Sequence, residues 1–136
     1  MVVLDTNALL YFFKGEGHVA ANLLAHPPAD VAVPSVVVFE IATGIAKSVS
    51  PKKRRAQLDK LLEVVTVLPF GFPEALVGGQ LRARLEKQGT PIGPMDTLIA
   101  ATALANGGQL VTRNVREFSR VPDLRVLDWY STPPPR

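Results

Sequence analysis

The chain has 136 residues, of which 47% are hydrophobic and 20% are charged, and its formal net charge is +3. This length is usual for one domain with its own core, and the composition excludes a disordered chain. No apolar run reaches the length of a membrane span, no signal peptide is evident, and the absence of cysteine excludes disulfides, thiolate metal ligands and cysteine nucleophiles. We therefore expect a cytoplasmic protein without membrane contact, whose mildly basic charge is compatible with a polyanionic partner.

The first half of the chain alternates short apolar runs with longer segments that end at turn residues. This pattern predicts strands at 2–4, 31–33 and 64–68, and helices at 8–13, 19–25, 36–47 and 51–63. The β-branched run Val36–Val38 favours a strand by itself. The preceding Pro34 and the length of the segment favour a helix, with Ser35 as its cap.

The second half continues the alternation. We expect helices at 74–88 and 97–105 and strands at 109–112 and 124–127, with Leu76, Val77, Leu81 and Leu85 sharing one helix face. Residues 128–136 carry no fold signal. Strands that alternate with helices predict an α/β domain with a mostly parallel sheet of four to five strands. We expect this single domain to cover 1–130, followed by a Pro-rich tail at 131–136.

Three acids, Asp5, Glu40 and Asp96, each stand alone in a long uncharged segment. Asp5 follows the first strand, and open α/β sheets bind ligands beyond the carboxyl ends of their strands. Asp5 and Asp96 also suit helix N-caps, and each acid can be satisfied by separate hydrogen bonds. If the three converge instead, their repulsion requires a cation, and oxygen ligands without Cys or His point to Mg²⁺ or Mn²⁺ rather than zinc.

Four segments carry a resemblance to a known family: LDTN after the first strand, the glutamate in FEIATG, IGPMDTLIA, and LVTRNVREFSRVPDL. Together, and in this order over nearly the whole chain, they resemble PIN-domain ribonucleases, and more narrowly the VapC toxins of VapBC toxin–antitoxin systems. The resemblance implies an α/β/α sandwich around a parallel sheet. It also implies Mg²⁺- or Mn²⁺-dependent endoribonuclease activity on tRNA or rRNA, neutralisation by a VapB antitoxin, and a homodimer.

The family's three acids correspond to Asp5, Glu40 and Asp96, which the resemblance makes catalytic and metal-binding. At the fourth position, often Asp in the family, this chain has Asn114, with Glu117 one helical turn on. Two alternatives follow for the fourth metal ligand. Either the neutral Asn114 side chain coordinates the ion, directly or through a water molecule, or the Glu117 carboxylate does so. Thr6 and Thr112 are candidates to orient ligands or water by hydrogen bonding, with ordinary capping as the alternative.

Basic residues are candidates for RNA contacts. We single out four arginines as candidates for phosphate contacts, Arg82, Arg113, Arg116 and Arg120, although surface arginines are more often simply solvated. Lys52, Lys53, Arg54 and Arg55 open another helix, where positive charge opposes the helix dipole. We favour a solvated helix face for this run, and the alternative is a rim that contacts phosphates.

Other functions with an Asp at a strand end fit less well. A receiver domain needs adjacent acids near the first strand and a late lysine, and an aspartate-nucleophile phosphatase needs a second Asp where Asn7 stands. A PIN-like domain that binds RNA or protein without cutting remains an alternative, because Asn114 is neutral.

Overall fold

A computed structural model describes residues 1–136 and contains five strands, all parallel. The strands are β1 (Val2–Leu4), β2 (Val31–Pro34), β3 (Thr66–Leu68), β4 (Gln109–Val111) and β5 (Val126–Leu127). The helices are α1 (Thr6–Lys14), α2 (Val19–Leu24), α3 (Ser35–Lys47), α4 (Lys52–Leu62), α5 (Phe72–Lys87), α6 (Pro94–Ala105) and α7 (Val115–Phe118), with a 3-10 turn at Pro28–Asp30. The predicted α/β class is confirmed, and the boundaries differ by a few residues.

The strand order is β3-β2-β1-β4-β5, so the chain builds outward from β1 in one direction and then returns to the other side of it. Val2 pairs with Val31 on one side and with Gln109 on the other. The direction of winding reverses between β1 and β4, and the carboxyl ends of these two strands form the topological switch point where such sheets bind ligands.

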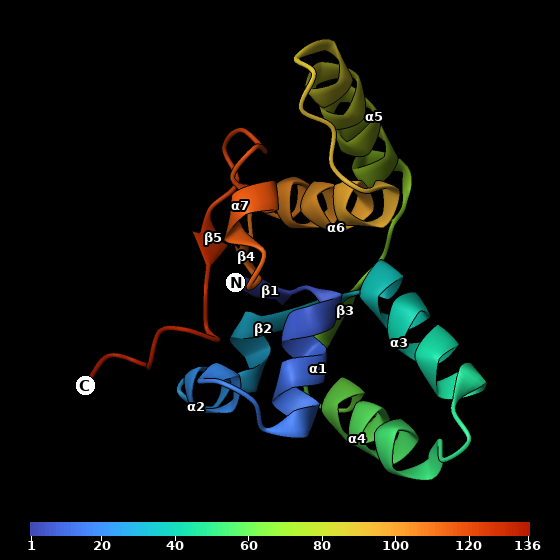
Figure 1. Cartoon of the computed structure of the whole chain (residues 1–136), viewed down its shortest axis with the longest axis vertical. Coiled ribbons are helices and arrows are strands. Elements are labelled where there is room, and N and C mark those ends of the chain that lie inside the picture. Colours follow the sequence, from blue (N-terminus) through green and yellow to red (C-terminus); the bar gives the residue numbers. More distant parts are fainter.

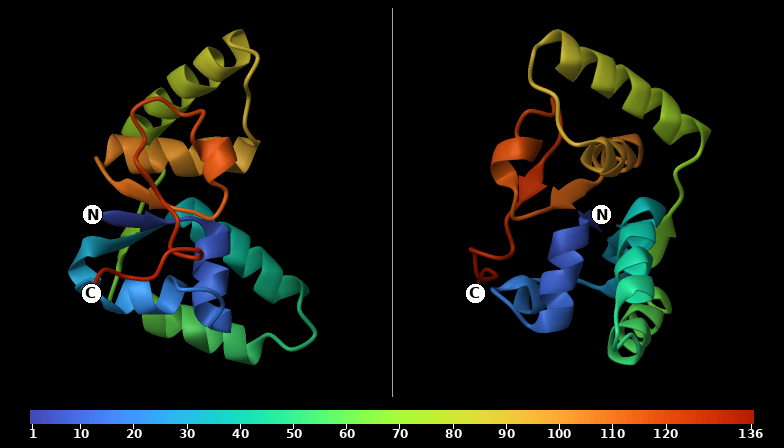
Figure 2. Two further views of the ribbon diagram at one scale, coloured as in Figure 1. Left: turned by 60° about the vertical axis from the view of Figure 1, so that its left-hand side comes forward. Right: turned by 45° about the vertical axis from the view of Figure 1, so that its right-hand side comes forward.

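Helices cover both sides of the sheet. Figure 1 shows α5 and α6 on one side and α1, α2 and α4 on the other, and the rotated views of Figure 2 agree. The core between these layers is built from aliphatic side chains of the central strands, including Val3, Leu4, Val33 and Leu110, each fully buried. Because both faces of the sheet are covered, the strands consist of continuous apolar runs.

Three local predictions are wrong. Ser35 is the first residue of α3 rather than its cap, because Pro34 holds the extended cap position. Asp96 is not the N-cap of α6: the helix begins at Pro94, a residue type favoured at this position, and Gly93 is the cap. Leu76 is 54% exposed, since the buried face of α5 is formed by Glu74, Gly78, Leu81 and Leu85.

The end of the chain contributes to the core. Trp129, in the stretch for which the sequence offered no structural role, is only 6% exposed and belongs to the main hydrophobic cluster. The side-chain amide of Asn22 donates to the carbonyl oxygens of Trp129 and Thr132, at 3.3 and 2.7 Å. The residues after β5 are therefore hydrogen-bonded to α2. Figure 1 shows the C-terminal segment running toward this helix.

Candidate active site

Asp5 and Thr112 lie side by side at the switch point, directly after β1 and β4. Leu4 pairs with Val111, and the amide of Asp5 donates to the carbonyl oxygen of Val111 at 3.1 Å. The Asp5 side chain is hydrogen-bonded to Thr112. The ends of two neighbouring parallel strands thus bring a carboxyl and a hydroxyl together across a separation of more than a hundred residues in sequence.

Asp5 also caps α1, because its Oδ1 accepts a hydrogen bond from the amide of Ala8 at 2.8 Å. The capping and site interpretations of Asp5 are therefore compatible. Its side chain is buried, and this burial, opposed by the bonds from Thr112 and Ala8, raises its pKa from 3.8 to about 6. The nearby charge of Glu40 contributes to the rise. A buried carboxyl held at this position is poised to gain from a positive partner.

Glu40 lies on α3 and turns toward the start of α1. Its Oε1 accepts a hydrogen bond of 2.5 Å from the Thr6 hydroxyl, so the residue directly after Asp5 holds the second acid. Two interpretations of Thr6 were open, helix capping or orientation of a site residue. The hydrogen bond to Glu40 agrees with the second. Thr112 likewise holds Asp5, and its hydroxyl also accepts from the amide of Asn114 at 3.0 Å.

Asp96, in the first turn of α6, pairs with Glu117 of α7. Burial and the Glu117 charge together raise the pKa of Asp96 to about 7. The pKa of Glu117 is lowered, first because its Oε1 accepts from the amide of Gly93 at 3.0 Å. The surroundings therefore favour the protonated form of Asp96 and the charged form of Glu117.

Asn114 does not face the other candidate ligands. Its side-chain amide donates to Oε2 of Glu117 at 2.6 Å, and its side chain is exposed. Of the two alternatives for the fourth position, the structure brings the Glu117 carboxyl beside Asp96 and gives Asn114 the role of holding that carboxyl.

The four acids form one electrostatic unit. The charges of Asp5, Glu40 and Glu117 all raise the pKa of Asp96, although the four acids come from four different helices or helix ends. No group of three or more acidic or histidine side chains stands in metal-ligand geometry, since each carboxyl is turned to a protein hydrogen-bond donor or to its neighbour. The arrangement is a cluster of carboxyls that destabilise one another's charged forms.

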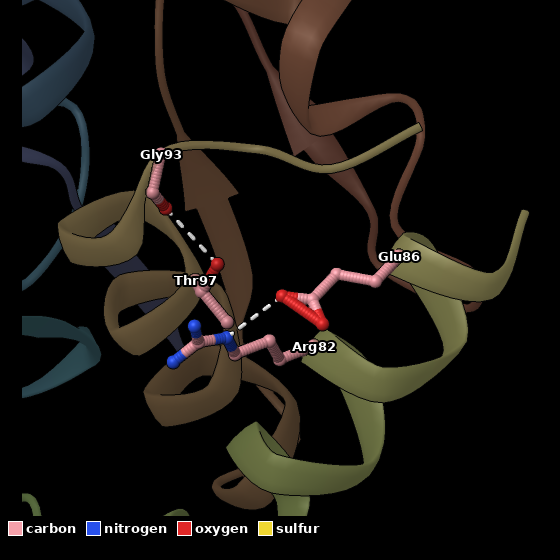
Figure 3. A network of polar contacts seen from close by, with 4 residues as sticks. All are labelled: Arg82, Glu86, Gly93 and Thr97. Carbon is pink, nitrogen blue, oxygen red and sulfur yellow. Dashed lines mark hydrogen bonds and ion pairs between the residues drawn. The ribbon is translucent and has the colours of Figure 1, made fainter. Parts of the chain in front are cut away.

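The four predicted arginines differ in their surroundings. Arg82 forms an ion pair with Glu86 one turn along α5, at 3.0 Å, and Figure 3 shows this pair on α5 beside the Thr97–Gly93 hydrogen bond at the start of α6. Arg120 donates to the carbonyl oxygen of Pro91 at 3.0 Å. No interaction of the Arg116 side chain was found, and it is exposed.

Arg113 is held by aromatic rings that sequence reasoning missed. Its guanidinium lies 3.6 Å from the centre of the Tyr130 ring and 5.7 Å from that of Tyr11. A hydrogen bond with Tyr11 and the proximity of both tyrosines raise the already high pKa of Arg113. Nothing in the sequence signals this cluster, because Tyr11 and Tyr130 lie at opposite ends of the chain.

A parallel α/β domain with a carboxyl cluster at its switch point defines a class of proteins suited to binding a divalent cation and an anionic ligand. Comparison with known proteins identifies the family. The family model described as "PIN domain" matches residues 2–124. The chain belongs to the PIN-domain family, and its relatives place it among the VapC ribonucleases.

The relatives cover nearly the whole chain. It is 32% identical to the tRNA(fMet)-specific endonuclease VapC of Salmonella typhimurium and 35% identical to ribonuclease VapC2 of Haemophilus influenzae, with 93% of this chain and 96% of each relative aligned. The solved structure of VapBC2 from Rickettsia felis bound to a promoter DNA fragment contains a chain with a TM-score of 0.87 and 32% identity, covering 95% of this chain and 99% of that one. The predicted family and sandwich fold are confirmed.

Proposed function

We propose that this protein is the toxin of a type II toxin–antitoxin system, an endoribonuclease that hydrolyses RNA phosphodiester bonds and is neutralised by a VapB antitoxin. The observation that carries the proposal is the carboxyl cluster at the switch point of a PIN-domain sheet, where burial and mutual repulsion raise the pKa values of Asp5 and Asp96. The relatives support it, since they are named as VapC ribonucleases and solved as VapBC complexes.

The chemistry of the cluster fits a divalent cation. The charges of Asp5, Glu40 and Glu117 act on Asp96, and the four carboxyl groups supply only oxygen ligands, the set that Mg²⁺ and Mn²⁺ prefer. We propose that Asp5, Glu40 and Asp96 hold the ion, with Glu117 as the fourth acid and Asn114 as its support. When bound, such an ion activates water and stabilises charge on the phosphate under attack.

The chain's own residues prepare the site for this ion. Thr6 and Thr112 fix the side chains of Glu40 and Asp5, and the Gly93 amide fixes Glu117. Because the pKa of Asp96 is raised to about 7, this carboxyl is partly protonated near neutral pH and must lose its proton for the cluster to carry its full negative charge. Ion binding and deprotonation of Asp96 are therefore coupled.

The substrate and the partners are proposed from the same relatives. One relative is named for cleavage of tRNA(fMet), which makes initiator tRNA the first substrate to test. Among the arginines, Arg113 directly follows Thr112, Arg116 lies on α7, and both are exposed, so we propose these two as the first candidates to contact the RNA backbone. We also propose that the protein forms a homodimer.

Replacing Asp96 with Asn tests the proposed activity. Asp96→Asn keeps the size of the side chain and removes the negative charge, so we expect cleavage of initiator tRNA to fall by on the order of a hundredfold or more, while the far-UV circular dichroism spectrum is unchanged. The matched control is Asp59→Asn, the same change at an exposed position of α4, which should cleave as the parent does. Parental rates in Asp96→Asn would refute the assignment of this acid.

A further inference from the structure

A small pocket opens beside Glu40, between α1, α3 and the start of α4. Its volume is about 210 Å³. Leu10 of α1 and Ile41 and Ile45 of α3 give it apolar walls, and Gly44 leaves part of the α3 surface bare. Glu40 lines the same pocket, so the pocket and the proposed active site share this residue.

Arg54 is the cationic residue in this pocket, and its position is fixed. Its Nη1 donates to Oε1 of Gln57 at 2.8 Å, and Gln57 in turn donates to the carbonyl oxygen of Phe13 at 3.1 Å. The guanidinium also lies 5.4 Å from the centre of the Phe13 ring. It forms no ion pair with an acid, so its remaining N–H groups are available to an anion in the pocket.

The other basic residues at the start of α4 differ from Arg54. Lys52, Lys53 and Arg55 are all exposed and line none of the main pockets, whereas Arg54 is half-buried. The sequence left two alternatives for this run, a solvated helix face or a rim that contacts phosphates. Three of its residues are solvated, as the first alternative expects, and Arg54 alone lines a pocket.

We propose that this pocket binds the nucleotide next to the scissile phosphodiester, with Arg54 contacting its phosphate and the apolar walls contacting its ribose or base. The inference rests on the proposed ribonuclease function. An RNA strand that passes Glu40 of α3 meets negative charge there, and Arg54 of α4, which lines the same pocket, offsets it. A planar guanidinium with free donors is suited to phosphate, and single-stranded RNA is commonly bound by a basic group beside apolar surface.

Gly44 provides a test that fills the pocket without removing any contact. A Cβ at Gly44 meets no atom within 4 Å, and the residue lies inside α3, where both leucine and alanine have a higher helix propensity than glycine. Gly44→Leu should therefore fold with an unchanged or higher Tm and yet lower kcat/KM on initiator tRNA by on the order of tenfold. Gly44→Ala is the control, and it should keep parental activity.

Arg54→Ala tests the charge, with Arg55→Ala as the matched control on the same helix. Loss of one phosphate contact should lower kcat/KM by roughly tenfold. It should also reduce the slope of log kcat/KM against log salt concentration by about 0.7, the value for one contact to single-stranded nucleic acid. Arg55→Ala should leave both quantities close to the parental values.

The outcomes separate this inference from the proposed function. If the parent cleaves tRNA and both Gly44→Leu and Arg54→Ala match it in rate and salt slope, the pocket is not a nucleotide site and the ribonuclease assignment stands. If these variants cleave normally but escape inhibition by the purified antitoxin, the occupant is the antitoxin and the inference is wrong. If the parent cleaves no RNA, both proposals fail together.

Discussion

Asp5 illustrates how one residue serves both the fold and the site. Its carboxyl caps α1 through Ala8 and is bonded to Thr112, yet the side chain is only 5% exposed. Burial of a carboxyl disfavours its charged form, and the hydrogen bonds offset only part of this cost. The residue that organises the start of the chain is therefore also one that destabilises the folded protein when ionised.

The raised pKa of Asp5 predicts a stability that falls as pH rises. Its pKa is about 6 in the folded state against 3.8 as the reference, so between these values the folded protein binds the proton more tightly than the unfolded chain does. The stabilisation is complete below about pH 4 and is lost as pH rises through about 6. We expect Asp5 to contribute a loss of about 1.4 kcal/mol in the free energy of unfolding between about pH 5 and about pH 8, measured by urea denaturation, out of about 3 kcal/mol over its full titration range. Asp96 acts in the same direction up to about pH 7.

Two controls isolate this effect. Asp5→Asn keeps an acceptor for the Ala8 amide but cannot ionise, so its free energy of unfolding should vary less over the same range. Millimolar Mg²⁺ or Mn²⁺ should restore stability to the parent at the higher pH, because an ion that binds only the folded cluster stabilises it by mass action. Equal pH profiles for the parent and Asp5→Asn would show that Asp5 is not the group responsible.

At the scale of elements, α5 and α6 pack closely because α5 presents a glycine to its neighbour. A Cβ at Gly78 would lie 3.3 Å from Cβ of Ala101 and 3.6 Å from Cζ of Phe70. Glu74, on the same buried face, is satisfied by the amide of Gly71, to which its Oε1 is 2.8 Å distant. This tight pairing matters to the site because α6 carries Asp96.

Gly78 and its neighbour Gly79 form a matched pair for testing this packing. Gly78→Val should lower the free energy of unfolding by about 1 to 3 kcal/mol through overpacking against Ala101. Gly79→Val makes the same change where a Cβ meets nothing within 4 Å, so it should leave stability unchanged or slightly raised. Urea denaturation of the two variants measures the difference, and equal stabilities would contradict close packing at Gly78.

At the scale of the whole molecule, the two ends of the chain are joined. The amide of His18 donates to the carbonyl oxygen of Tyr130 at 3.0 Å, and the Tyr130 ring fills the space against Gly17, whose φ is +62°. Together with Asn22, these contacts place Trp129 in the core and Tyr130 under Arg113. The C-terminal segment thus supports the loop before α2 and the surface next to the site.

Truncation distinguishes the part of the C-terminal segment that stabilises the fold. Trp129→Ala should cost about 3 to 5 kcal/mol, since it removes a large buried side chain. Deletion of residues 133–136 removes mainly exposed residues and should change stability by less than about 0.5 kcal/mol. Thermal unfolding of both variants makes the comparison, and a stable Trp129→Ala protein would mean that the segment is only loosely attached.

The sequence by itself determined the class of fold, the family and the identity of the isolated acids. Apolar runs and turn residues are local signals, and Val2–Leu4 or the stretch from Pro94 to Ala105 carries them within a few neighbouring residues. An acid such as Glu40, the only charged residue between Asp30 and Lys47, is equally visible, because burial of an unpaired charge is costly wherever the helix packs.

Only the tertiary structure decided which side chains meet. Local propensity cannot relate residues that are far apart in the sequence. It therefore does not predict the pairing of Asp96 with Glu117, the hydrogen bond from Thr6 to Glu40, the burial of Trp129 or the position of Arg54 at a pocket. The physical reason is that hydrogen bonds and charge interactions act over a few ångströms of space. Neighbours at that range are set by the winding of strands and helices and not by distance along the chain.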